Sequence, residues 1–182
     1  MASFDEAVKN ILVIEGGFVD NPNDPGGATN HGISLRFLQT IKDYELGDID
    51  NDGDIDYFDV AEMKVVEAKA LYKKYWWDKY KYEDIPDQAV ANKIFDMSVN
   101  MGARQAHRLL QRAINSTLGQ IALVDDGFLG PMTSKGLQVA LQQPLALLVG
   151  LRAHQAGFYR FLVAQDSKYE EFLKGWLNRA VS

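Results

Sequence analysis

Apolar residues recur at helical spacing along most of the chain. Phe4, Ala7, Ile11 and Ile14 fall three or four positions apart behind Ser3, a typical helix N-cap, and predict a helix over residues 3–15. The same spacing predicts further helices over residues 35–41, 60–82, 87–97, 103–114, 137–141, 145–161 and 169–177. No alternating segment is long enough to predict more than a very short strand. We therefore predict a mainly α fold.

Length and composition favour one compact domain, or a catalytic lobe with a small appended lobe. A chain of 182 residues, of which 47% are hydrophobic, can bury one full core. The sequence contains no cysteine, which excludes disulfides and thiolate metal sites. The net charge is -6, and the six aspartates between residues 48 and 59 account for all of it. Because the rest of the chain is neutral, we do not expect it to bind nucleic acid.

The first residues do not have the pattern of a targeting segment. Asp5, Glu6 and Lys9 interrupt the apolar positions, so this stretch predicts an amphipathic helix and not a signal peptide. The sequence also has no uninterrupted apolar window of the length that a membrane span needs. We expect synthesis in the cytoplasm without a signal peptide and no insertion into a membrane.

The stretch from Val13 to Ser34 carries the candidate catalytic chemistry. Glu15 ends the first helical run before a glycine pair, while Asp24 and Thr29 belong to a loop shaped by proline and glycine. Hydrolysis of a glycosidic bond needs one protonated carboxyl for the leaving oxygen and a second group that holds water or attacks. Glu15 is the better acid, because desolvation by apolar neighbours favours a protonated carboxyl. Alternatively, Glu15 only ends the helix and Asp24 only caps a turn.

The order Glu15, Asp24, Thr29 resembles the signature of tailed-phage lysozymes, with one residue fewer before the threonine. The wider wording, Glu-Gly-Gly-Phe-Val through Asp-Pro-Gly-Gly-Ala-Thr-Asn-His-Gly-Ile, is similar to glycoside hydrolase family 108, the muramidase and secretion-activator family of the lysozyme-like superfamily. The resemblance implies a lysozyme-like helical fold and cleavage of the β-1,4 bond between N-acetylmuramic acid and N-acetylglucosamine. It also implies that Glu15 is the general acid and that Asp24, helped by Thr29, positions water or stabilises developing positive charge.

Other segments extend the resemblance over nearly the whole chain. Residues 95–102 resemble a second family signature, and residues 124–134 are similar to the turn motif of small helical peptidoglycan-binding modules, with Thr133 at the cap of the following helix. The implied domains are a catalytic lobe, residues 1–85, and a helical lobe that resembles a peptidoglycan-binding domain, residues 86–182. We expect the two lobes to pack as one unit.

Three further residues are candidates for substrate binding. His31 lies in the loop before the second predicted helix, Trp77 lies in an aromatic-rich segment, and Asn100 lies in the second signature. Each has an ordinary structural alternative: His31 as a loop residue, Trp77 as a core residue and Asn100 as a helix cap.

Residues 48–59 have the spacing of an EF-hand calcium loop. Counted from Asp48 as position one, carboxylates occupy positions one, three, five, nine and twelve, and Gly53 occupies position six, where the loop turns sharply. The residue at position seven supplies a backbone carbonyl in such loops, and position twelve is aspartate in place of the usual glutamate. The predicted ligands of one structural Ca²⁺ are Asp48, Asp50, Asp52, Asp54, Asp56 and Asp59. A solvated acidic loop is the alternative.

Two functions of different classes remain open at this point. The first is an enzyme, an N-acetylmuramidase that binds peptidoglycan glycan strands as a monomer and lyses cell walls, as an antimicrobial phage endolysin does. Such a protein, made without a leader, would reach the wall in the periplasm through a holin or another non-classical route. The second is a non-catalytic peptidoglycan-binding or secretion-assisting protein. An intact Glu15 beside Asp24 and Thr29 favours the enzyme, because a binding protein needs no acid there.

Overall fold

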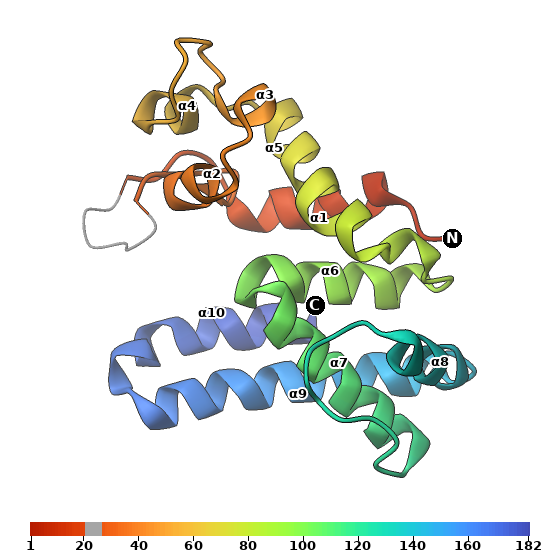
Figure 1. The fold of residues 1–182 in the computed structure, drawn as a ribbon. Coiled ribbons are helices and arrows are strands. Elements are labelled where there is room, and N and C mark those ends of the chain that lie inside the picture. The colour runs from red at the N-terminus through yellow and green to blue at the C-terminus, as the bar shows by residue number, and fades with distance from the viewer. Residues whose placement is uncertain (21–26) are drawn as a thin grey trace. The chain divides into compact units, whose positions relative to one another are not determined.

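The computed structural model describes residues 1–20 and 27–182, with the side chains of residues 13–15 outside the description. The described chain is mainly helical, which confirms the predicted fold class (Figure 1). It divides into two compact units: Ser3–Glu83, and Asp84–Ser182 together with Met1–Ala2. No described helix is both long and apolar enough to cross a membrane.

The first unit, Ser3–Glu83, contains short helices around a small hairpin. Its helices are α1 (Phe4–Glu15), α2 (Leu35–Ile41), α3 (Tyr44–Gly47), α4 (Tyr57–Glu62) and α5 (Val65–Tyr72), followed by the π-helix η1 (Lys73–Asp78) and the 3-10 helix η2 (Tyr82–Asp84). Strands β1 (Thr29–Asn30) and β2 (Ile33–Ser34) pair antiparallel between α1 and α2. Local sequence sets two helix starts, since the hydroxyls of Ser3 and Ser34 accept from the N–H groups of Glu6 and Phe37.

The predicted helix over residues 60–82 is broken in the structure. Helix α4 begins earlier, at Tyr57, and the chain leaves helical geometry at Met63 (φ -56°, ψ 125°) before α5 starts. The carboxylate of Glu67 accepts from the N–H of Lys64 at 2.9 Å and so fixes the start of α5. The side chain of Asn30 accounts for the break, because it binds the carbonyls of Val60 and Met63 that a continuous helix would use.

The core of this unit lies between α1 and α5, which pack against each other. Both helices supply fully buried apolar side chains, Val8 and Ile11 from α1 and Ala68 and Leu71 from α5. The ring of Trp77, on η1, is also buried. This arrangement fixes the axis of α1, and therefore the position of the helix end at which Glu15 lies.

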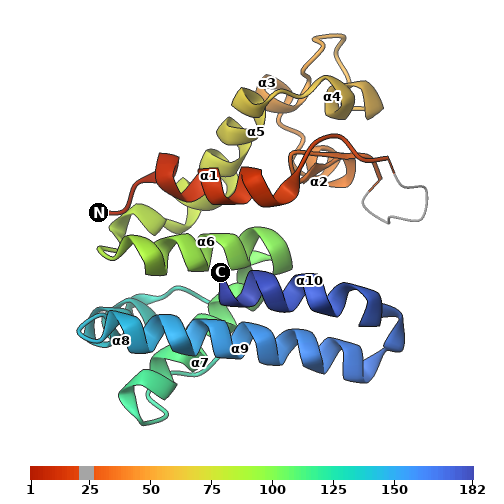
Figure 2. The same ribbon diagram turned by 180° about the vertical axis from the view of Figure 1, so that it is seen from behind.

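The second unit is a bundle built on one long helix. Its helices are α6 (Gln88–Met101), α7 (Ala103–Leu118), α8 (Pro131–Ala140), α9 (Pro144–Gln165) and α10 (Glu170–Val181), with the 3-10 turn η3 (Ser167–Tyr169) between the last two. Helix α9 contacts α6, α7 and α10 (Figure 2). Trp176 stacks on Tyr159 with ring centroids 5.0 Å apart, so it joins α10 to α9.

The turn over residues 124–134 is built around a buried glutamine. The side-chain amide of Gln111 donates to the Thr133 hydroxyl at 3.0 Å and accepts from the N–H of Gly127 at 2.8 Å. A Cβ on Gly127 would lie 2.5 Å from the carbonyl oxygen of Arg104, so only glycine fits there. Thr133 was expected to cap the following helix, but it lies inside α8, and Gly130 is the N-cap.

Candidate active site

The C-terminal end of α1 presents the candidate general acid. Glu15 is the last residue of this helix, and Gly16 follows with φ 71°, a left-handed conformation that glycine adopts without strain. The chain therefore leaves the helix immediately after the carboxylate-bearing residue. The side chain of Glu15 lies outside the described residues, and so does the whole of Asp24.

A pair of backbone hydrogen bonds brings Thr29 to the segment that follows Glu15. The N–H of Val19 donates to the carbonyl of Thr29 at 2.8 Å, and the N–H of Thr29 donates back to the carbonyl of Val19 at 2.9 Å. Thr29 then continues into the hairpin, where it pairs with Ser34. The two candidate residues Glu15 and Thr29 therefore flank one loop whose base is closed by backbone pairing.

His31 lies at the tip of the hairpin and connects it to α1. His31 (φ 48°) and Gly32 (φ 79°) both adopt positive φ, the geometry of a type I′ turn, in which asparagine is the favoured first residue. The ring Nδ1 of His31 lies 3.2 Å from the carbonyl oxygen of Gly16, and the Tyr72 hydroxyl donates to the His31 carbonyl at 2.9 Å. The histidine thus ties the turn to the residue directly after Glu15.

Asn30 supports this hairpin and was missed by sequence reasoning. Its side chain is buried, and Nδ2 donates to the carbonyls of Val60 at 2.9 Å and Met63 at 3.1 Å. These bonds join the strand that follows Thr29 to the end of α4. Local sequence around Asn30 does not reveal these hydrogen bonds, because both acceptors lie about 30 residues away along the chain.

The structure corrects the assignment of Trp77 to substrate binding. Only 1% of this residue is exposed, and its ring meets Phe4 and Tyr82 edge to face. Trp77 is therefore a core residue of the first unit. The neighbouring Trp76 is half-buried and lies against Phe37, with ring centroids 4.7 Å apart.

Asn100, the third candidate for substrate binding, lies near the end of α6 in the second unit. Its Oδ1 accepts from the Tyr159 hydroxyl at 2.5 Å, and that hydroxyl in turn accepts from the buried amide of Gln155 at 2.9 Å. Asn100 does not cap α7, whose N-cap is Gly102. The hydrogen bonds give Asn100 a structural role between α6 and α9 and fix the orientation of its amide.

The two charged residues of α6 that face α10 form a structural cluster. Asp96 pairs with Arg179 through Nε at 2.9 Å and Nη2 at 2.9 Å, and both side chains are nearly buried. Lys93 is buried as well, and its Nζ donates to the carbonyl of Arg179 at 2.7 Å. Burial lowers the pKa of Lys93 to about 8. The nearby cations Arg152 and Arg179 contribute to this shift, whereas the carboxylate of Asp96 opposes it.

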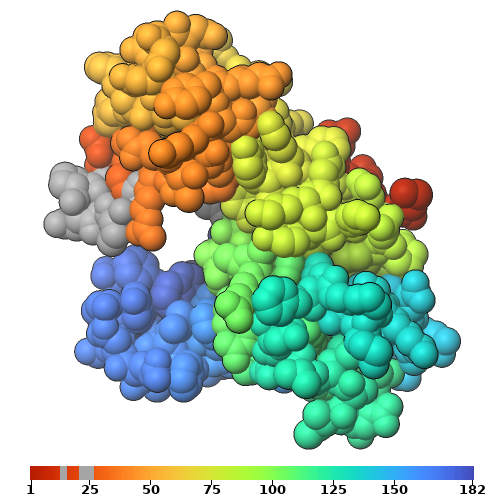
Figure 3. All heavy atoms as spheres, viewed as in Figure 1, coloured from red at the N-terminus to blue at the C-terminus, as the bar shows by residue number. Residues whose placement is uncertain are grey.

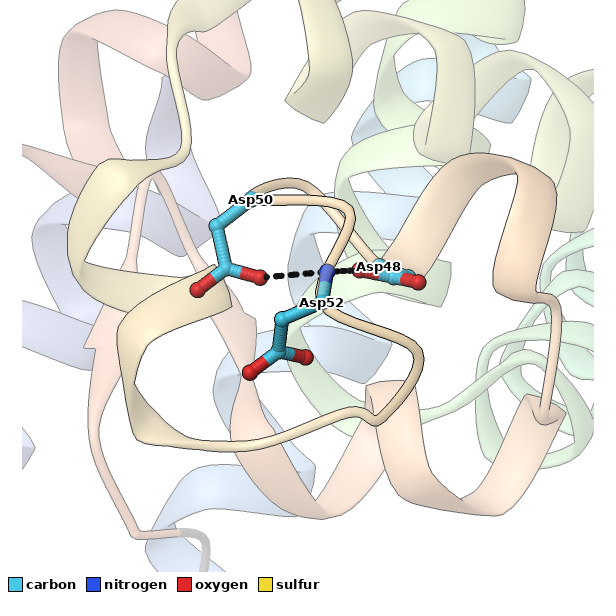
Figure 4. A group of neighbouring side chains, drawn as sticks. All are labelled: Asp48, Asp50 and Asp52. Atoms are coloured by element: carbon cyan, nitrogen blue, oxygen red, sulfur yellow. Dashed lines mark hydrogen bonds between the residues drawn. The ribbon is translucent and has the colours of Figure 1, made fainter.

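The acidic loop of residues 48–59 runs from the end of α3 into the first turn of α4, at the molecular surface (Figure 3). Asp48, Asp50 and Asp52 offer carboxylate oxygens that lie within 4.8 Å of one another, and the N–H of Asp52 donates to both Asp48 and Asp50 (Figure 4). Gly53 turns the chain with φ 98°. Desolvation and the negative charges of its neighbours raise the pKa of Asp50, although the Asp52 N–H opposes this shift.

Asp59 closes the same loop from inside. It is fully buried, and its two carboxylate oxygens accept from the N–H groups of Ile49 at 2.5 Å and Asp56 at 2.7 Å. Each carboxylate oxygen has two lone pairs, so Oδ2 of Asp59, which accepts one N–H, can still bind a cation, whereas Oδ1 also accepts from the N–H of Asp50 at 3.4 Å. A second group of carboxylates, Asp54, Asp56 and Asp59, also lies within 4.8 Å. All-oxygen donors on a glycine-turned loop fit Ca²⁺, which prefers six to eight oxygen ligands.

Comparisons with known proteins agree with this architecture. The family model of glycosyl hydrolase 108 matches residues 8–102, and a model described as a predicted peptidoglycan domain matches residues 105–181. Among solved structures, SagA of Brucella abortus superposes with a TM-score of 0.65 at 22% identity, covering 98% of this chain and 96% of that one. No curated protein matches the sequence.

The fold and the site define a mainly helical protein with a candidate acid at the end of a helix. The chain belongs to glycosyl hydrolase family 108, because the family model covers more than half of it. It is thus a glycoside hydrolase, and the second match indicates peptidoglycan as the substrate class. The first match extends beyond Glu83 through α6, so the family region includes elements of both compact units.

Proposed function

We propose that this protein is an N-acetylmuramidase that hydrolyses the β-1,4 bond between N-acetylmuramic acid and N-acetylglucosamine in peptidoglycan. Glu15 donates a proton to the leaving glycosidic oxygen. Asp24, with the hydroxyl of Thr29, positions a water molecule or stabilises the positive charge that develops on the sugar ring. Membership of family 108 supports the reaction class, and the choice of bond is the proposal.

The observation that carries the proposal is the way in which the ends of one loop are held. Glu15 ends α1, the Val19–Thr29 bridge closes the base of the loop, and His31 contacts Gly16. These contacts keep strand β1, which carries the Thr29 hydroxyl, beside residues 16–19, which follow Glu15. A mechanism in which two groups cooperate needs those groups to be held in fixed positions relative to each other.

The test is hydrolysis of purified peptidoglycan by wild type and Glu15→Gln. We expect wild type to release new reducing ends, with mass spectrometry identifying N-acetylmuramic acid at those ends, and we expect Glu15→Gln to lose this activity while its circular dichroism spectrum stays unchanged. Glu6→Gln is the matched control, because Glu6 is exposed in the first turn of the same helix. Full activity of Glu15→Gln, or reducing ends on N-acetylglucosamine, would refute the proposal.

Asp24→Asn and Thr29→Val separate the two supporting groups. We expect Asp24→Asn to reduce kcat less than Glu15→Gln if the carboxylate holds water, because the amide still forms hydrogen bonds. A loss as large as that of Glu15→Gln would instead identify Asp24 as a nucleophile or an essential base. Thr29→Val keeps the shape of the strand residue and removes only the hydroxyl.

We propose in addition that residues 48–59 bind one structural Ca²⁺. The ligands would be the carboxylates of Asp48, Asp50, Asp52, Asp56 and Asp59 and the main-chain carbonyl of Asp54. The loop carries six negative charges without a basic residue, so a divalent cation would relieve the repulsion between them. The ion would take no part in bond cleavage.

For the biological role, we propose wall lysis in the manner of a phage endolysin. The test is turbidity of a bacterial suspension whose outer membrane has been permeabilised. Addition of wild type should clear the suspension, and Glu15→Gln should not. Binding to sacculi without clearing and without new reducing ends would favour the alternative, a non-catalytic binding or secretion-assisting protein.

A further inference from the structure

Three aromatic side chains form an exposed patch in the first unit. Phe18 is 40% exposed, Tyr57 40% and Phe58 58%. Tyr57 lies between the other two, with its ring centroid 5.7 Å from each and both pairs edge to face. Edge-to-face packing joins the three rings into one surface while large parts of them remain in contact with water. We call Phe18, Tyr57 and Phe58 the aromatic patch.

Helix geometry holds two of these rings on the outside. Tyr57 and Phe58 are the first residues of α4, whose start is fixed by the Asp56 carboxylate, an acceptor for the N–H of Phe58 at 2.6 Å. The next two residues, Asp59 and Val60, are fully buried and anchor the opposite face of the helix. None of the three rings is fully buried, so each keeps part of its face accessible at the surface. Grouped exposed apolar side chains commonly mark a binding surface.

The patch reaches the candidate active site through Phe18. This residue lies three positions after Glu15, on the segment between the end of α1 and the Val19–Thr29 bridge. Its ring contact with Tyr57 connects that segment to α4. A polymer that passes the end of α1 would therefore find exposed rings within a few residues of the candidate acid.

We propose that the aromatic patch is a binding subsite for a sugar ring of the glycan strand. The inference rests on the proposed function and adds the residues that hold the substrate beside the reacting bond. A pyranose ring presents axial C–H groups on one face, and these pack on the electron-rich face of an aromatic ring. The patch has no cation, and its sequence neighbours Asp20 and Asp56 are acidic, so a sugar face suits it better than an anionic stem peptide.

The test uses three substitutions at Phe58, the most exposed ring. Phe58→Tyr keeps an aromatic face, Phe58→Leu keeps apolar area without a ring, and Phe58→Ala removes both. On purified sacculi we expect KM to rise about fivefold to tenfold for Phe58→Ala, to rise nearly as much for Phe58→Leu, and to be restored by Phe58→Tyr. Phe161→Ala is the matched control, because Phe161 is 56% exposed on α9 in the other unit.

A binding measurement shows which part of peptidoglycan the patch contacts. Glycan strands freed of stem peptides are titrated into Glu15→Gln and into Glu15→Gln with Phe58→Ala. Weaker binding by the double variant supports a sugar subsite. Equal dissociation constants, together with an unchanged KM on sacculi, overturn it, and so does a loss seen only with strands that carry stem peptides.

The outcome is distinguishable from failure of the proposed function. If wild type releases no reducing ends, the muramidase proposal fails, whereas normal hydrolysis by all Phe58 variants rejects the subsite alone. Because Phe58 belongs to the acidic loop's last turn, each variant is also melted with and without calcium. A melting difference equal to that of wild type shows that the substitution has left the loop intact.

Discussion

The ring Nδ1 of His31 lies 3.2 Å from the carbonyl oxygen of Gly16, the residue directly after Glu15. A carbonyl only accepts hydrogen bonds, so Nδ1 of His31 is the donor in this contact. Histidine also occupies a positive-φ turn position that asparagine would fill with less strain. The side chain therefore has a role that the turn itself does not require, and we infer that it positions the end of α1.

Replacement of His31 separates this positioning from the turn. We expect His31→Asn to fold at least as stably as wild type, because asparagine suits positive φ, yet to lose kcat on the order of tenfold, because its shorter side chain does not hold Gly16. His31→Ala should lose both activity and stability. Wild-type kcat in His31→Asn would contradict the positioning role, and thermal melts measured beside the kinetics exclude unfolding as the cause.

Replacement of Asn30 should lower the stability of the first unit more than the small size of this side chain suggests. Asn30→Ala leaves the buried carbonyls of Val60 and Met63 without their donor, so we expect the free energy of unfolding to fall by about 2 to 3 kcal/mol. Urea denaturation followed by circular dichroism measures the difference. Asn178→Ala, at an exposed position on α10, is the control and should change stability by less than about 0.5 kcal/mol. Similar values for the two variants would show that these hydrogen bonds contribute little.

Calcium should stabilise the protein if residues 48–59 bind it. An ion that binds only the folded state contributes on the order of 3 kcal/mol at a hundredfold excess over its dissociation constant, so a chelator should lower the Tm. Asp48→Ala and Asp52→Ala should remove the difference between chelator and calcium. Glu62→Ala, at an exposed position near the end of α4, should keep it. Metal-free wild type that melts identically with and without calcium would identify an ordinary acidic loop.

The buried Lys93 predicts a stability change at alkaline pH. Its pKa is lowered to about 8 in the folded state, against an ordinary value of 10.5, so between these two values the unfolded chain binds a proton that the folded chain has released. Stability should therefore rise with pH across this window, relative to Lys93→Met, which cannot titrate. Below about pH 8 both states carry the proton, and the cost of burying the charge is then constant.

Urea denaturation of wild type and Lys93→Met at several pH values between 7 and 10.5 measures this dependence. The other charged groups around Lys93 are Asp96, Arg152 and Arg179, which both proteins share. Their contributions cancel in the difference between the two proteins. A difference that stays constant over the whole range would show that Lys93 keeps an ordinary pKa in the folded state.

Much of the fold follows from local sequence. Ser3 caps the helix that it was expected to start, and Ser34 and Asp87 cap α2 and α6, because a cap bonds to backbone groups only three residues away. Helical apolar spacing likewise predicted the mainly α fold, because this pattern relates residues only three or four positions apart. The candidate acid could also be placed from sequence, since the Glu15-Gly16 junction marks the end of a helix wherever that helix packs.

Tertiary structure decided what depends on partners distant in sequence. It broke the predicted helix at Met63, because Asn30, 33 residues earlier, takes the carbonyl that a continuous helix would use. It buried Trp77 against Phe4 and left Phe58 exposed, although both are aromatic residues in helical segments. Residue type and spacing set which side chains can bind sugar or metal. Only long-range packing determines which of them reach the surface, because burial depends on the elements that cover each face.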